Sequence, residues 1–549
     1  MNEQSAISLG PERSLVHNLA TQTELRPDAS AIFYYGTRIN YADLWDEVQR
    51  LATYLVNDAG VQPGDRVAID LQNSPQFVCA YYAILLAGAI VVPLNPMYRS
   101  TEVEAIIVNA GVNVVFVAED LLDRFDGWQA GHRMRLIVAR YADALVTDPP
   151  VSLPSVMTIN RIDLASIPQA IGWHEAIDRP PQPHLPGLEL DIDTAAVMPY
   201  TSGSTGIPKG CLHAHRGVMH TAVAQADWYE LSPSSVVTAV QPLFHVAGMQ
   251  GSMNASIYAG AALVILTRWD ADAAINLFAR HAVTFWNAPP TMVVDMLSRG
   301  RAVDAALAKI AVVTGGGAAM PEAVSARLKS DYGVDYIEAY GLSETMSPSH
   351  MNPLVGSRRG TIGIPIQNTL SMIIDPETLA PLPDGEVGEI VVSGPQVMRG
   401  YWNNPDADAK AFFDYHGQRY LRTGDLGTRD ADGFFRMVDR VKRMINASGF
   451  KVWPKEVEGV LFGHEAVHAC CVVASPDPYR GETVKAIVQL APGMTATAAE
   501  LTDWLRPRLA AFKLPRLIAF VADLPLTASH KIDWRQLQDR EKASSEPRI

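Results

Sequence analysis

Tyr200–Gly210 reads YTSGSTGIPKG and follows directly on the apolar residues 195–198, which predict a buried strand. Glycines in this stretch let the backbone approach a ligand closely, while hydroxyl groups supply hydrogen-bond donors and a lysine supplies a positive charge. These residues are Gly203, Gly206, Gly210, Thr201, Ser202, Ser204, Thr205 and Lys209. The stretch therefore predicts a loop that holds phosphate groups.

This loop differs from the phosphate loop of common kinases and GTPases. Their pattern, G-x-x-x-x-G-K-[ST], is not met, because only two residues separate Gly203 from Gly206 and because Pro208 opposes immediate helix formation. A flexible Ser/Gly linker would have a similar composition. A linker seldom stands between a buried strand and further apolar segments of one domain, so we favour the ligand-binding loop.

Short apolar runs of strand type alternate with helix-period stretches along the chain. Examples are residues 67–69, 89–92, 114–117, 263–266 and 310–313. The alternation predicts an α/β architecture, and the 549 residues are enough for roughly two to four domains. The polar stretch DRVKRMINAS predicts a domain boundary. We expect an N-terminal domain over residues 1–440 and a C-terminal domain over residues 441–549.

Composition and charge exclude several protein classes. Apolar residues make up 48% of the chain and charged residues 19%, which argues against disorder, and the formal net charge of −14 disfavours nucleic acid as a partner. The longest apolar run, residues 77–92, is shorter than the ~20 residues of a membrane-spanning helix. We expect it to form a buried helix that stops at Gly88, followed by a strand. Four cysteines without a C-x-x-C pair and a polar N-terminus predict a cytoplasmic protein with no integral membrane segment.

Further motifs follow the loop along the chain. They read PLFH (242–245), GGGAAM (315–320), YGLSET (340–345), YLRTGD (420–425), DRVKRMI (439–445), SGFKVWPKEVE (448–458) and PLTASHKI (525–532). Together with YTSGSTGIPKG they resemble the motifs of the adenylate-forming superfamily, which includes acyl-CoA synthetases, firefly luciferase and the adenylation domains of peptide synthetases. The resemblance covers nearly the whole chain. It implies a large multi-subdomain α/β N-terminal domain with a small, mobile α+β C-terminal domain.

The resemblance implies a site for ATP and AMP. Glu344 of YGLSE is the implied Mg²⁺ ligand, and Asp425 of RTGD is the implied partner of the ribose hydroxyls. Lys531 is the implied cation for the charge that develops on the α-phosphate. The expected catalytic residues are Thr201, Lys209, Glu344 and Lys531. The expected nucleotide site comprises Thr201, Ser202, Gly203, Ser204, Thr205, Gly206, Lys209, Gly315, Gly316, Gly317, Tyr340, Gly341, Ser343, Glu344, Asp425, Arg440 and Lys531.

The C-terminal motifs imply a second half-reaction with CoA. In the superfamily the small domain rotates about a hinge, here Lys442, and presents residues that line the pantetheine channel. The implied channel residues are Gly449, Phe450 and Lys451, and a side chain larger than that of Gly449 would block the channel. In one departure from the superfamily, His530 occupies the usual glycine position before the catalytic lysine. We expect activity to be retained, because histidine is among the less penalised residues at positive φ.

The acid-binding pocket is expected to be apolar. Its implied residues are His245, Val246, Gly248, Met249, Gly315 and Met346. His245 is either a gate beside the reacting carboxylate or a hydrogen-bonded core histidine. The lining lacks an arginine or lysine for a second carboxylate, so we expect a monocarboxylic acid. The run GPQVMRGYWNNPDA (394–407) is most similar to bacterial fatty acyl-CoA ligases, which favours a medium- or long-chain fatty acid, with aryl, short-chain and branched acids open.

Other functions remain as alternatives. An acyl carrier protein as acceptor is disfavoured because only residues 532–549 follow Lys531, although a separate carrier is not excluded. A luciferase-like oxygenase and a noncatalytic nucleotide-binding protein are the other candidates. The spacing of His213, His215 and His220 could suit a metal, but without a supporting Cys or acidic pattern we predict a surface role and no zinc site. A homodimer is left open.

Overall fold

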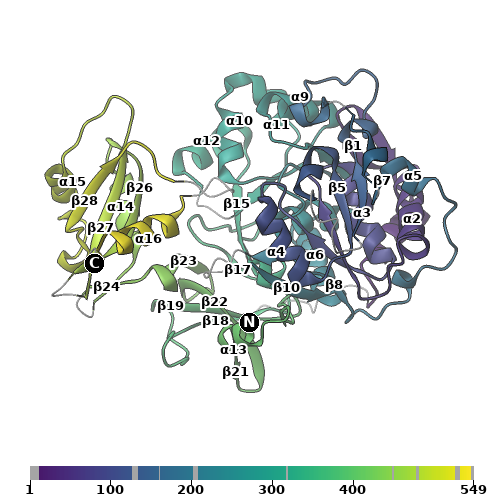
Figure 1. Cartoon of the computed structure of the whole chain (residues 1–549). Helices are drawn as coiled ribbons and strands as arrows, with labels where there is room; N and C mark the ends of the chain where they lie inside the picture. Colours follow the sequence, from purple (N-terminus) through teal and green to yellow (C-terminus); the bar gives the residue numbers. More distant parts are fainter. Residues whose placement is uncertain are drawn as a thin grey trace. The chain divides into compact units, whose positions relative to one another are not determined.

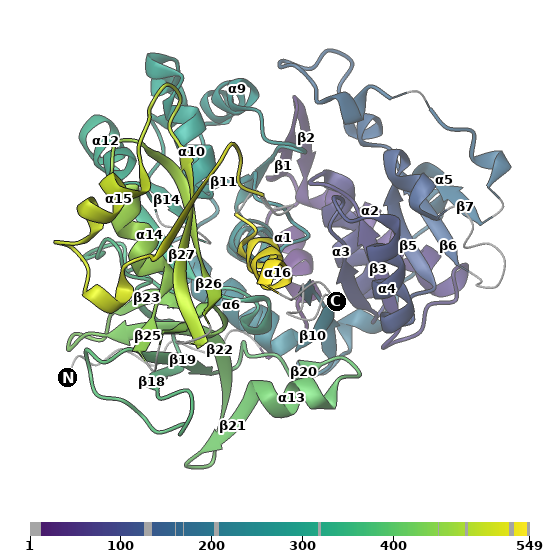
Figure 2. The same cartoon turned by 60° about the vertical axis from the view of Figure 1, so that its left-hand side comes forward.

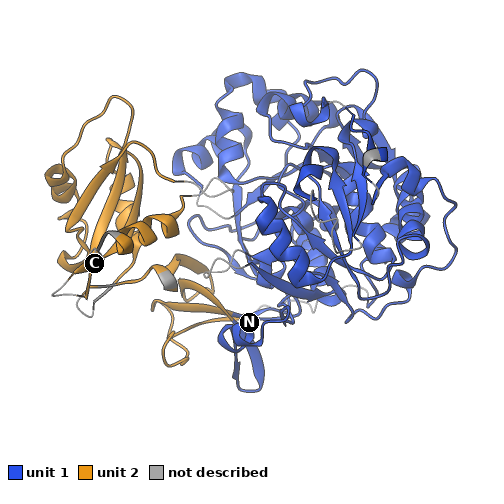
Figure 3. Cartoon of the chain, viewed as in Figure 1, with its two compact units in different colours: residues 1–370, 392–421 blue, residues 371–391, 422–549 orange. Residues whose placement is uncertain are grey.

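The computed structural model describes residues 12–125, 134–159, 161–167, 169–201, 208–316, 320–447, 450–477, 481–525 and 532–545. The chain divides into two compact units (Figures 1 and 3). Unit 1 comprises residues 1–370 and 392–421, and unit 2 comprises residues 371–391 and 422–549. The expected fold class, a large α/β N-terminal part with a smaller C-terminal part, is confirmed. The boundary predicted between residues 440 and 441 stays a prediction.

Two nine-stranded sheets form the frame of unit 1 over its described residues. The first runs in the order β17 (Ile364–Pro365), β16 (His350–Met351), β15 (Tyr336–Tyr340), β14 (Val312–Gly315), β13 (Phe285–Asn287), β11 (Val236–Ala239), β12 (Ala262–Ile265), β1 (Ser30–Tyr34) and β2 (Thr37–Asn40). The strands from β15 to β1 are parallel, and antiparallel strands close both ends. The carboxyl ends of β13, β14 and β15 therefore meet at one edge of the sheet.

The second sheet carries the predicted phosphate loop. Its order is β20 (Gly400–Tyr401), β10 (Lys209–Ala214), β8 (Ala195–Val197), β4 (Ile90–Pro93), β3 (Arg66–Asp70), β5 (Val114–Ala118), β6 (Arg135–Ala139) and β7 (Ala170–Gly172), with β9 (Tyr200–Thr201) also paired to β10. The strands from β8 to β7 are parallel, whereas β10 is antiparallel to each of its partners. Every residue of β4 and β5 is buried, as expected for strands that are covered on both faces.

Local sequence signals explain the helix predicted in the run 77–92. Helix α3 spans Pro75–Leu86, with Pro75 in its first turn and the Ser74 side chain accepting a hydrogen bond from the Phe77 backbone N–H. Gly88 then adopts φ +78°, and strand β4 follows. The predicted helix, glycine stop and strand are therefore confirmed.

Helices cover both sheets of unit 1. They are α1 (Val16–Leu25), α2 (Tyr41–Asn57), α3, α4 (Ser100–Ala110), α5 (Trp173–Ile177), α6 (His215–Trp228), α7 (Val246–Gly248), α8 (Ala255–Ala259), α9 (Ala271–His281), α10 (Pro290–Leu297), α11 (Asp304–Leu307), α12 (Glu322–Tyr332) and α13 (Pro405–Ala411). A π-helix over Met249–Asn254 joins α7 to α8. Strand β21 (Phe412–Tyr415) follows α13. Helix α6 contacts β8, β10 and the π-helix.

Unit 2 contains strands β18 (Leu370–Ile374), β19 (Gly388–Ser393), β22 (Gln418–Arg429) and β23 (Phe435–Arg440), of which β18 and β22 begin in unit 1 and β19 ends there. A further sheet runs in the order β25 (Phe450–Val452), β24 (Ile445–Ala447), β27 (Gly481–Leu490) and β26 (Val467–Asp477), with β28 (Leu517–Val521) paired to β27. Its helices are α14 (Pro454–Phe462), α15 (Ala498–Leu505) and α16 (Trp534–Ser545).

Strand β26 illustrates how this last sheet is built. Cys470 and Val472 pack with residues of α14 and α15, whereas Cys471 and Val473 pack with Leu537 of α16. Because successive side chains of a strand point to opposite faces, the helices cover the sheet on both sides (Figure 2).

Among the helices of the described residues, none combines the length and the apolar composition needed to cross a membrane.

Candidate active site

The two ends of the predicted phosphate loop lie side by side. Thr201 of β9 pairs with Lys209 of β10, and Tyr200 pairs with Gly210. A Cβ atom on Gly210 would lie 2.9 Å from Cζ of Tyr200, so the hairpin requires glycine there. The loop residues Ser202, Gly203, Ser204, Thr205 and Gly206 lie outside the described residues. Their phosphate-binding role stays a prediction.

Glu344 and Lys209 converge on a tyrosine that the sequence motifs did not single out. The Tyr401 hydroxyl donates a hydrogen bond to Oε1 of Glu344 at 2.9 Å, and Nζ of Lys209 lies 4.9 Å from the centre of the Tyr401 ring. Tyr401 lies opposite Cys211 in the β10–β20 ladder. Burial, followed by the Glu344 charge, raises the pKa of Tyr401, so its hydroxyl keeps its proton and remains a donor.

The loop after β15 contains Glu344 and has a strained backbone directly after it. A short 3-10 helix covers Ser343–Thr345, and Met346 and Ser347 then adopt φ values of +48° and +41°. Left-handed conformations are unfavourable for residues other than glycine and are concentrated at functional sites. The backbone N–H of Met398 also donates to the Glu344 carbonyl oxygen at 2.8 Å. The position of Glu344 is thus fixed from its own loop and from the segment before β20.

A buried histidine of β10 hydrogen-bonds to the loop that contains Glu344. Nε2 of His213 donates to the Ser343 carbonyl oxygen at 2.7 Å, and the side chain is only 1% exposed. Burial lowers the pKa of His213 to about 4, so the ring is neutral at neutral pH.

The predicted surface role of the three histidines is wrong, because His213, His215 and His220 are all buried. Strand β10 and helix α6 place them inside unit 1, where Nδ1 of His215 accepts a hydrogen bond from the Leu15 backbone N–H. Among the described residues, no group of three or more His, Cys, Asp or Glu is arranged to hold a metal ion.

Gly315 and Gly316 stand at the carboxyl end of β14, where backbone approaches backbone. A Cβ atom on Gly315 would overlap the Ala288 carbonyl oxygen and the Tyr336 hydroxyl, and one on Gly316 would overlap the Ala339 carbonyl oxygen. Only glycine fits either position. Gly317 lies outside the described residues.

Tyr340 and Gly341 follow at the carboxyl end of the neighbouring strand β15. The Tyr340 ring lies 5.7 Å from that of His350 and is 9% exposed, so little of it faces solvent. A Cβ atom on Gly341 would lie 2.8 Å from Cα of Pro348. These residues therefore border the same edge of the sheet as Gly315, and their contact with adenine stays a prediction.

Three of the predicted acid-pocket residues, Val246, Gly248 and Met249, lie on α7 and at the start of the π-helix. Val246, Met249 and Met346 are buried, and a Cβ atom on Gly248 would overlap the Pro242 carbonyl oxygen. His245 is exposed and caps α7 by accepting a hydrogen bond from the Ala247 backbone N–H at 3.2 Å. The alternative of a core histidine is therefore wrong, while the role of a gate stays a prediction.

Asp425 and Arg440 form a second group, within unit 2. They face each other in the β22–β23 ladder, and Nε of Arg440 lies 3.0 Å from Oδ1 of Asp425. Asp425 is 1% exposed, whereas the Arg440 side chain is 49% exposed. The pair unites a buried carboxylate with a guanidinium that reaches solvent, an arrangement suited to the predicted ribose and phosphate contacts.

The segment around the predicted hinge is tied down by a buried carboxylate. Asp439 accepts hydrogen bonds from the backbone N–H groups of Arg440 and Lys455, both at 2.7 Å. Arg443 pairs with Asp439 and with Glu458 of α14. This network was not predicted, although the charged residues of DRVKRMI (439–445) are a signal for it in the sequence. Only the backbone of Lys442, Phe450 and Lys451 is described, and Gly449, His530 and Lys531 lie outside the described residues.

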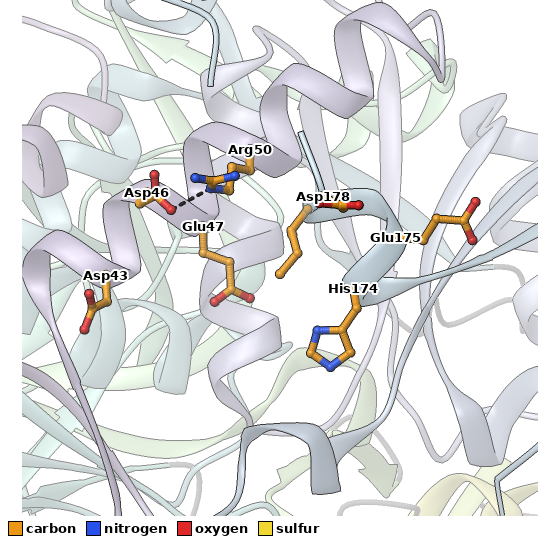
Figure 4. Close-up of a pocket in the computed structure, with 8 residues that line it drawn as sticks. Asp43, Asp46, Glu47, Arg50, His174, Glu175 and Asp178 are labelled. Atoms are coloured by element: carbon orange, nitrogen blue, oxygen red, sulfur yellow. Dashed lines mark hydrogen bonds and ion pairs between the residues drawn. The ribbon is translucent and has the colours of Figure 1, made fainter. Parts of the chain in front are cut away.

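Figure 4 shows a pocket in unit 1. It has a volume of about 660 Å³ and lies between α2 and α5. Its lining comprises Asp43, Asp46, Glu47, Arg50, His174, Glu175, Ile177 and Asp178. Arg50 pairs with Asp46 at 2.6 Å, and the Trp173 indole donates to Glu47 at 2.7 Å. The Arg50–Asp46 pair lies within α2, and the Trp173–Glu47 hydrogen bond connects α2 to α5. No residue predicted for nucleotide, acid or CoA lines the pocket.

Comparison with known proteins agrees with this geometry. The family model for AMP-binding enzymes matches residues 19–402, and that for the AMP-binding enzyme C-terminal domain matches residues 456–531. The long-chain-fatty-acid–CoA ligase of Bacillus subtilis is 34% identical over 97% of this chain and 95% of its own length. A feruloyl-CoA synthase of Amycolatopsis is 32% identical over 93% of this chain and 96% of its own length.

A solved structure supports the same assignment. ATP-bound MatB from Rhodopseudomonas palustris superimposes with a TM-score of 0.84 at 26% identity, covering 97% of this chain and 99% of that one. The chain therefore belongs to the AMP-binding enzyme family, in the adenylate-forming superfamily, and is an ATP-dependent, AMP-forming CoA ligase.

Proposed function

We propose that the enzyme joins a monocarboxylic acid to CoA in two steps, with a medium- or long-chain fatty acid as its first candidate substrate. The convergence of Lys209 and Glu344 on Tyr401 carries this proposal. It places a cation and a carboxylate beside the two strands that bracket the predicted phosphate loop. A site for the triphosphate of ATP needs both kinds of charge.

In the first step an oxygen of the acid attacks the α-phosphorus of ATP, and pyrophosphate leaves. Lys209 stabilises phosphate oxygens from the start of β10, and Lys531 is proposed to stabilise the charge that develops on the α-phosphate. Asp425 receives hydrogen bonds from the ribose. Because Asp425 is buried beside Arg440, it is held ready as an acceptor.

Glu344 suits Mg²⁺, which takes oxygen ligands and is usually bound by one or two carboxylates together with substrate phosphates. Tyr401 holds the Glu344 carboxylate by a hydrogen bond to one of its oxygens. Mg²⁺ bound there would neutralise charge on the triphosphate. The residues present therefore fit the predicted ion.

In the second step the CoA thiol attacks the acyl carbon, and AMP leaves. We assign Gly449, Phe450 and Lys451 to the pantetheine channel and Lys442 to the hinge of a C-terminal domain over residues 441–549. The network of Asp439, Arg443 and Glu458 supports this assignment, because it anchors both sides of Lys442.

The predicted pocket lining supports an acid with an apolar body. Val246, Met249 and Met346 are apolar and buried, which supports a hydrocarbon or aryl body for the acid. The relatives include a ligase named for long-chain fatty acids and one named for feruloyl-CoA, so an aryl acid is the alternative substrate. A cytoplasmic location and a homodimer stay proposals.

The test measures pyrophosphate release with ATP and Mg²⁺ against straight-chain acids of increasing length and aryl acids, with and without CoA. We expect acid-dependent release, followed by CoA-dependent AMP formation, and loss of both in Lys531→Ala. The exposed Lys329→Ala, on α12, is the matched control and should retain both activities. Nucleotide binding without pyrophosphate release would instead favour the noncatalytic protein. Oxygen consumption or light with a suitable acid would favour the luciferase-like oxygenase.

A further inference from the structure

A buried carboxylate lies in the same sheet of unit 2 as Asp425. Glu389 belongs to β19, which neighbours β22 in this sheet (Figure 1). The Glu389 side chain is only 2% exposed. A buried charge is costly unless it is paired and hydrogen-bonded. The partners of Glu389 therefore indicate what its buried charge does.

The two oxygens of Glu389 bind residues on either side of Thr423. Oε2 accepts hydrogen bonds from Nε and Nη2 of Arg422, at 2.9 and 2.6 Å. Oε1 accepts a hydrogen bond from the backbone N–H of Gly424 at 2.9 Å. One carboxylate thus holds both ends of the three-residue segment that immediately precedes Asp425.

The conformation of Gly424 explains why this segment needs to be held. Gly424 adopts φ +70°, a left-handed conformation inside β22. A Cβ atom there would meet nothing within 4 Å, so side-chain packing does not fix this position. Glycine has a wider choice of backbone conformations than other residues. Because a change at Gly424 would redirect Asp425, the hydrogen bond from Gly424 to Glu389 restrains both residues.

A second contact from β19 restrains the backbone of Asp425. Oγ1 of Thr423 donates to the carbonyl oxygen of Ile390, the residue after Glu389, at 2.6 Å. The same Oγ1 accepts a hydrogen bond from the Asp425 backbone N–H at 3.1 Å. The Asp425 side chain in turn lies 3.0 Å from Nε of Arg440. Two consecutive residues of β19 therefore determine where Asp425 of β22 lies.

We propose that Glu389 is a positioning residue for the nucleotide. It holds the turn at Gly424 so that the Asp425 carboxylate meets both ribose hydroxyls, and it thereby sets the preference for a ribonucleotide. This inference rests on the proposed function, in which Asp425 receives hydrogen bonds from the ribose. Hydrogen bonds weaken steeply when distance or angle departs from the optimum, so a displaced Asp425 would lose both of them. Glu389 acts on the nucleotide through Asp425.

The test compares kcat/KM of pyrophosphate release for ATP and for 2′,3′-dideoxy-ATP, which lacks both ribose hydroxyls. We call the ratio of the two values the ribose preference. In the wild type it should be at least about 100-fold, because a site that hydrogen-bonds hydroxyl groups rejects an analogue without them. Glu389→Gln removes the charge that pairs with Arg422 and should lower the ribose preference about tenfold, through a higher KM for ATP. The rate with the dideoxy analogue should change little.

Asp384→Asn is the matched control. Asp384 also pairs with an arginine of β22, Arg429, at 2.6 Å, but both side chains are exposed. This variant should keep the wild-type ribose preference. If Glu389→Gln does not fold, Glu389→Asp keeps the charge and shortens the side chain, so that it cannot bind Arg422 and Gly424 at once. It should lower the ribose preference by a smaller factor.

A double-mutant cycle tests whether Glu389 acts through Asp425. Asp425→Asn alone should lower the ribose preference by more than Glu389→Gln does. In the Asp425→Asn background, Glu389→Gln should have little further effect on this ratio, because the carboxylate that it positions is already gone.

Each outcome has a distinct meaning. An equal loss with both nucleotides in Glu389→Gln and Glu389→Asp would overturn the inference and leave the proposed function intact. Additive effects on the ribose preference in the double mutant would also overturn it, because Glu389 would then act independently of Asp425. An unchanged ribose preference in Asp425→Asn would refute the ribose contact of the proposed function, and this inference with it.

Discussion

The carboxyl and amino ends of the first sheet's parallel strands are built in opposite ways. At the carboxyl ends, Gly315 and Gly316 leave no room for a Cβ atom, and Met346 adopts a left-handed conformation. At the amino ends, a Cβ atom on Gly333 would meet nothing within 4 Å, beside a pocket of about 500 Å³ whose lining includes Glu230 and Asp335. At the carboxyl ends the packing thus dictates which residue fits, and we call this the determined edge. At the amino ends the packing leaves room for a larger side chain, and we call this the permissive edge. In open α/β sheets ligands bind outside the carboxyl ends, and that is the determined edge here.

The largest expected effect comes from Glu344→Gln at the determined edge. Loss of the carboxylate charge should lower acid-dependent pyrophosphate release by about 100- to 1,000-fold, the usual effect of removing one preorganised electrostatic contact. The measurement is the rate of release with ATP and Mg²⁺. Asp331→Asn, near the amino end of β15, is the matched control and should leave the rate unchanged. Equal rates in Glu344→Gln and the wild type would refute the assigned role of Glu344.

Two glycine substitutions compare the edges directly. Gly315→Ala should lower the free energy of unfolding by about 3 kcal/mol or more, because the new methyl group overlaps the Ala288 carbonyl oxygen. Gly333→Ala meets no neighbour, but its φ of +73° is unfavourable for alanine, so about 1 kcal/mol is expected. Urea unfolding of both variants gives the comparison. Similar losses would mean that the two edges do not differ in packing.

Low pH should weaken the determined edge through its buried histidines. Burial lowers the pKa of His213 to about 4 and that of His350 to about 3, against about 6.5 in the unfolded chain. Below pH 6.5 the unfolded state binds more protons, so stability present above pH 6.5 is lost as the pH falls towards 4. The loss is about 2 kcal/mol for each histidine at pH 5.

Thermal midpoints between pH 7.5 and 5 measure this effect. His213→Gln keeps a donor for the Ser343 carbonyl oxygen and removes the titrating group, so its midpoint should fall less steeply with pH than that of the wild type. His184→Gln changes an exposed histidine and should show the wild-type slope. An unchanged slope in His213→Gln would show that His213 does not contribute to the pH dependence.

The sequence motifs predicted which residues lie at the determined edge, but they did not predict the contacts between residues that are far apart in the sequence. GGGAAM and YGLSET located Gly315 and Glu344, because close backbone approach and strained turns need particular residues at particular spacings. The burial of His213 was not predicted, because it depends on residues 343–345, which lie more than a hundred positions away in the sequence. Tyr229 carries no motif either. The contact of Tyr229, which caps the end of α6, with Thr314 of β14 depends on the packing of the helix against the sheet.

The smallest expected effect comes from Tyr401→Phe. This variant tests whether Tyr401, which lies outside YGLSET, helps to position Glu344. Tyr401→Phe removes the hydroxyl that donates to Glu344 but keeps the ring beneath Lys209. A hydrogen bond to a charged group contributes about 1.5–3 kcal/mol, and solvent can replace part of it, so we expect about a tenfold loss in pyrophosphate release. Tyr415→Phe, at the end of β21, is the matched control and should retain the wild-type rate.

A double-mutant cycle decides how Tyr401 acts. If it positions the Glu344 carboxylate, Tyr401→Phe should have little further effect in a Glu344→Gln background, because the charge that it orients is already gone. Additive losses would mean that Tyr401 acts independently of Glu344. In that case Tyr401→Leu, which also removes the ring, should reveal the contribution through Lys209. Tyr401, whose run 394–407 was used only to predict the substrate class, would then share control of the phosphate site with Glu344 of YGLSET.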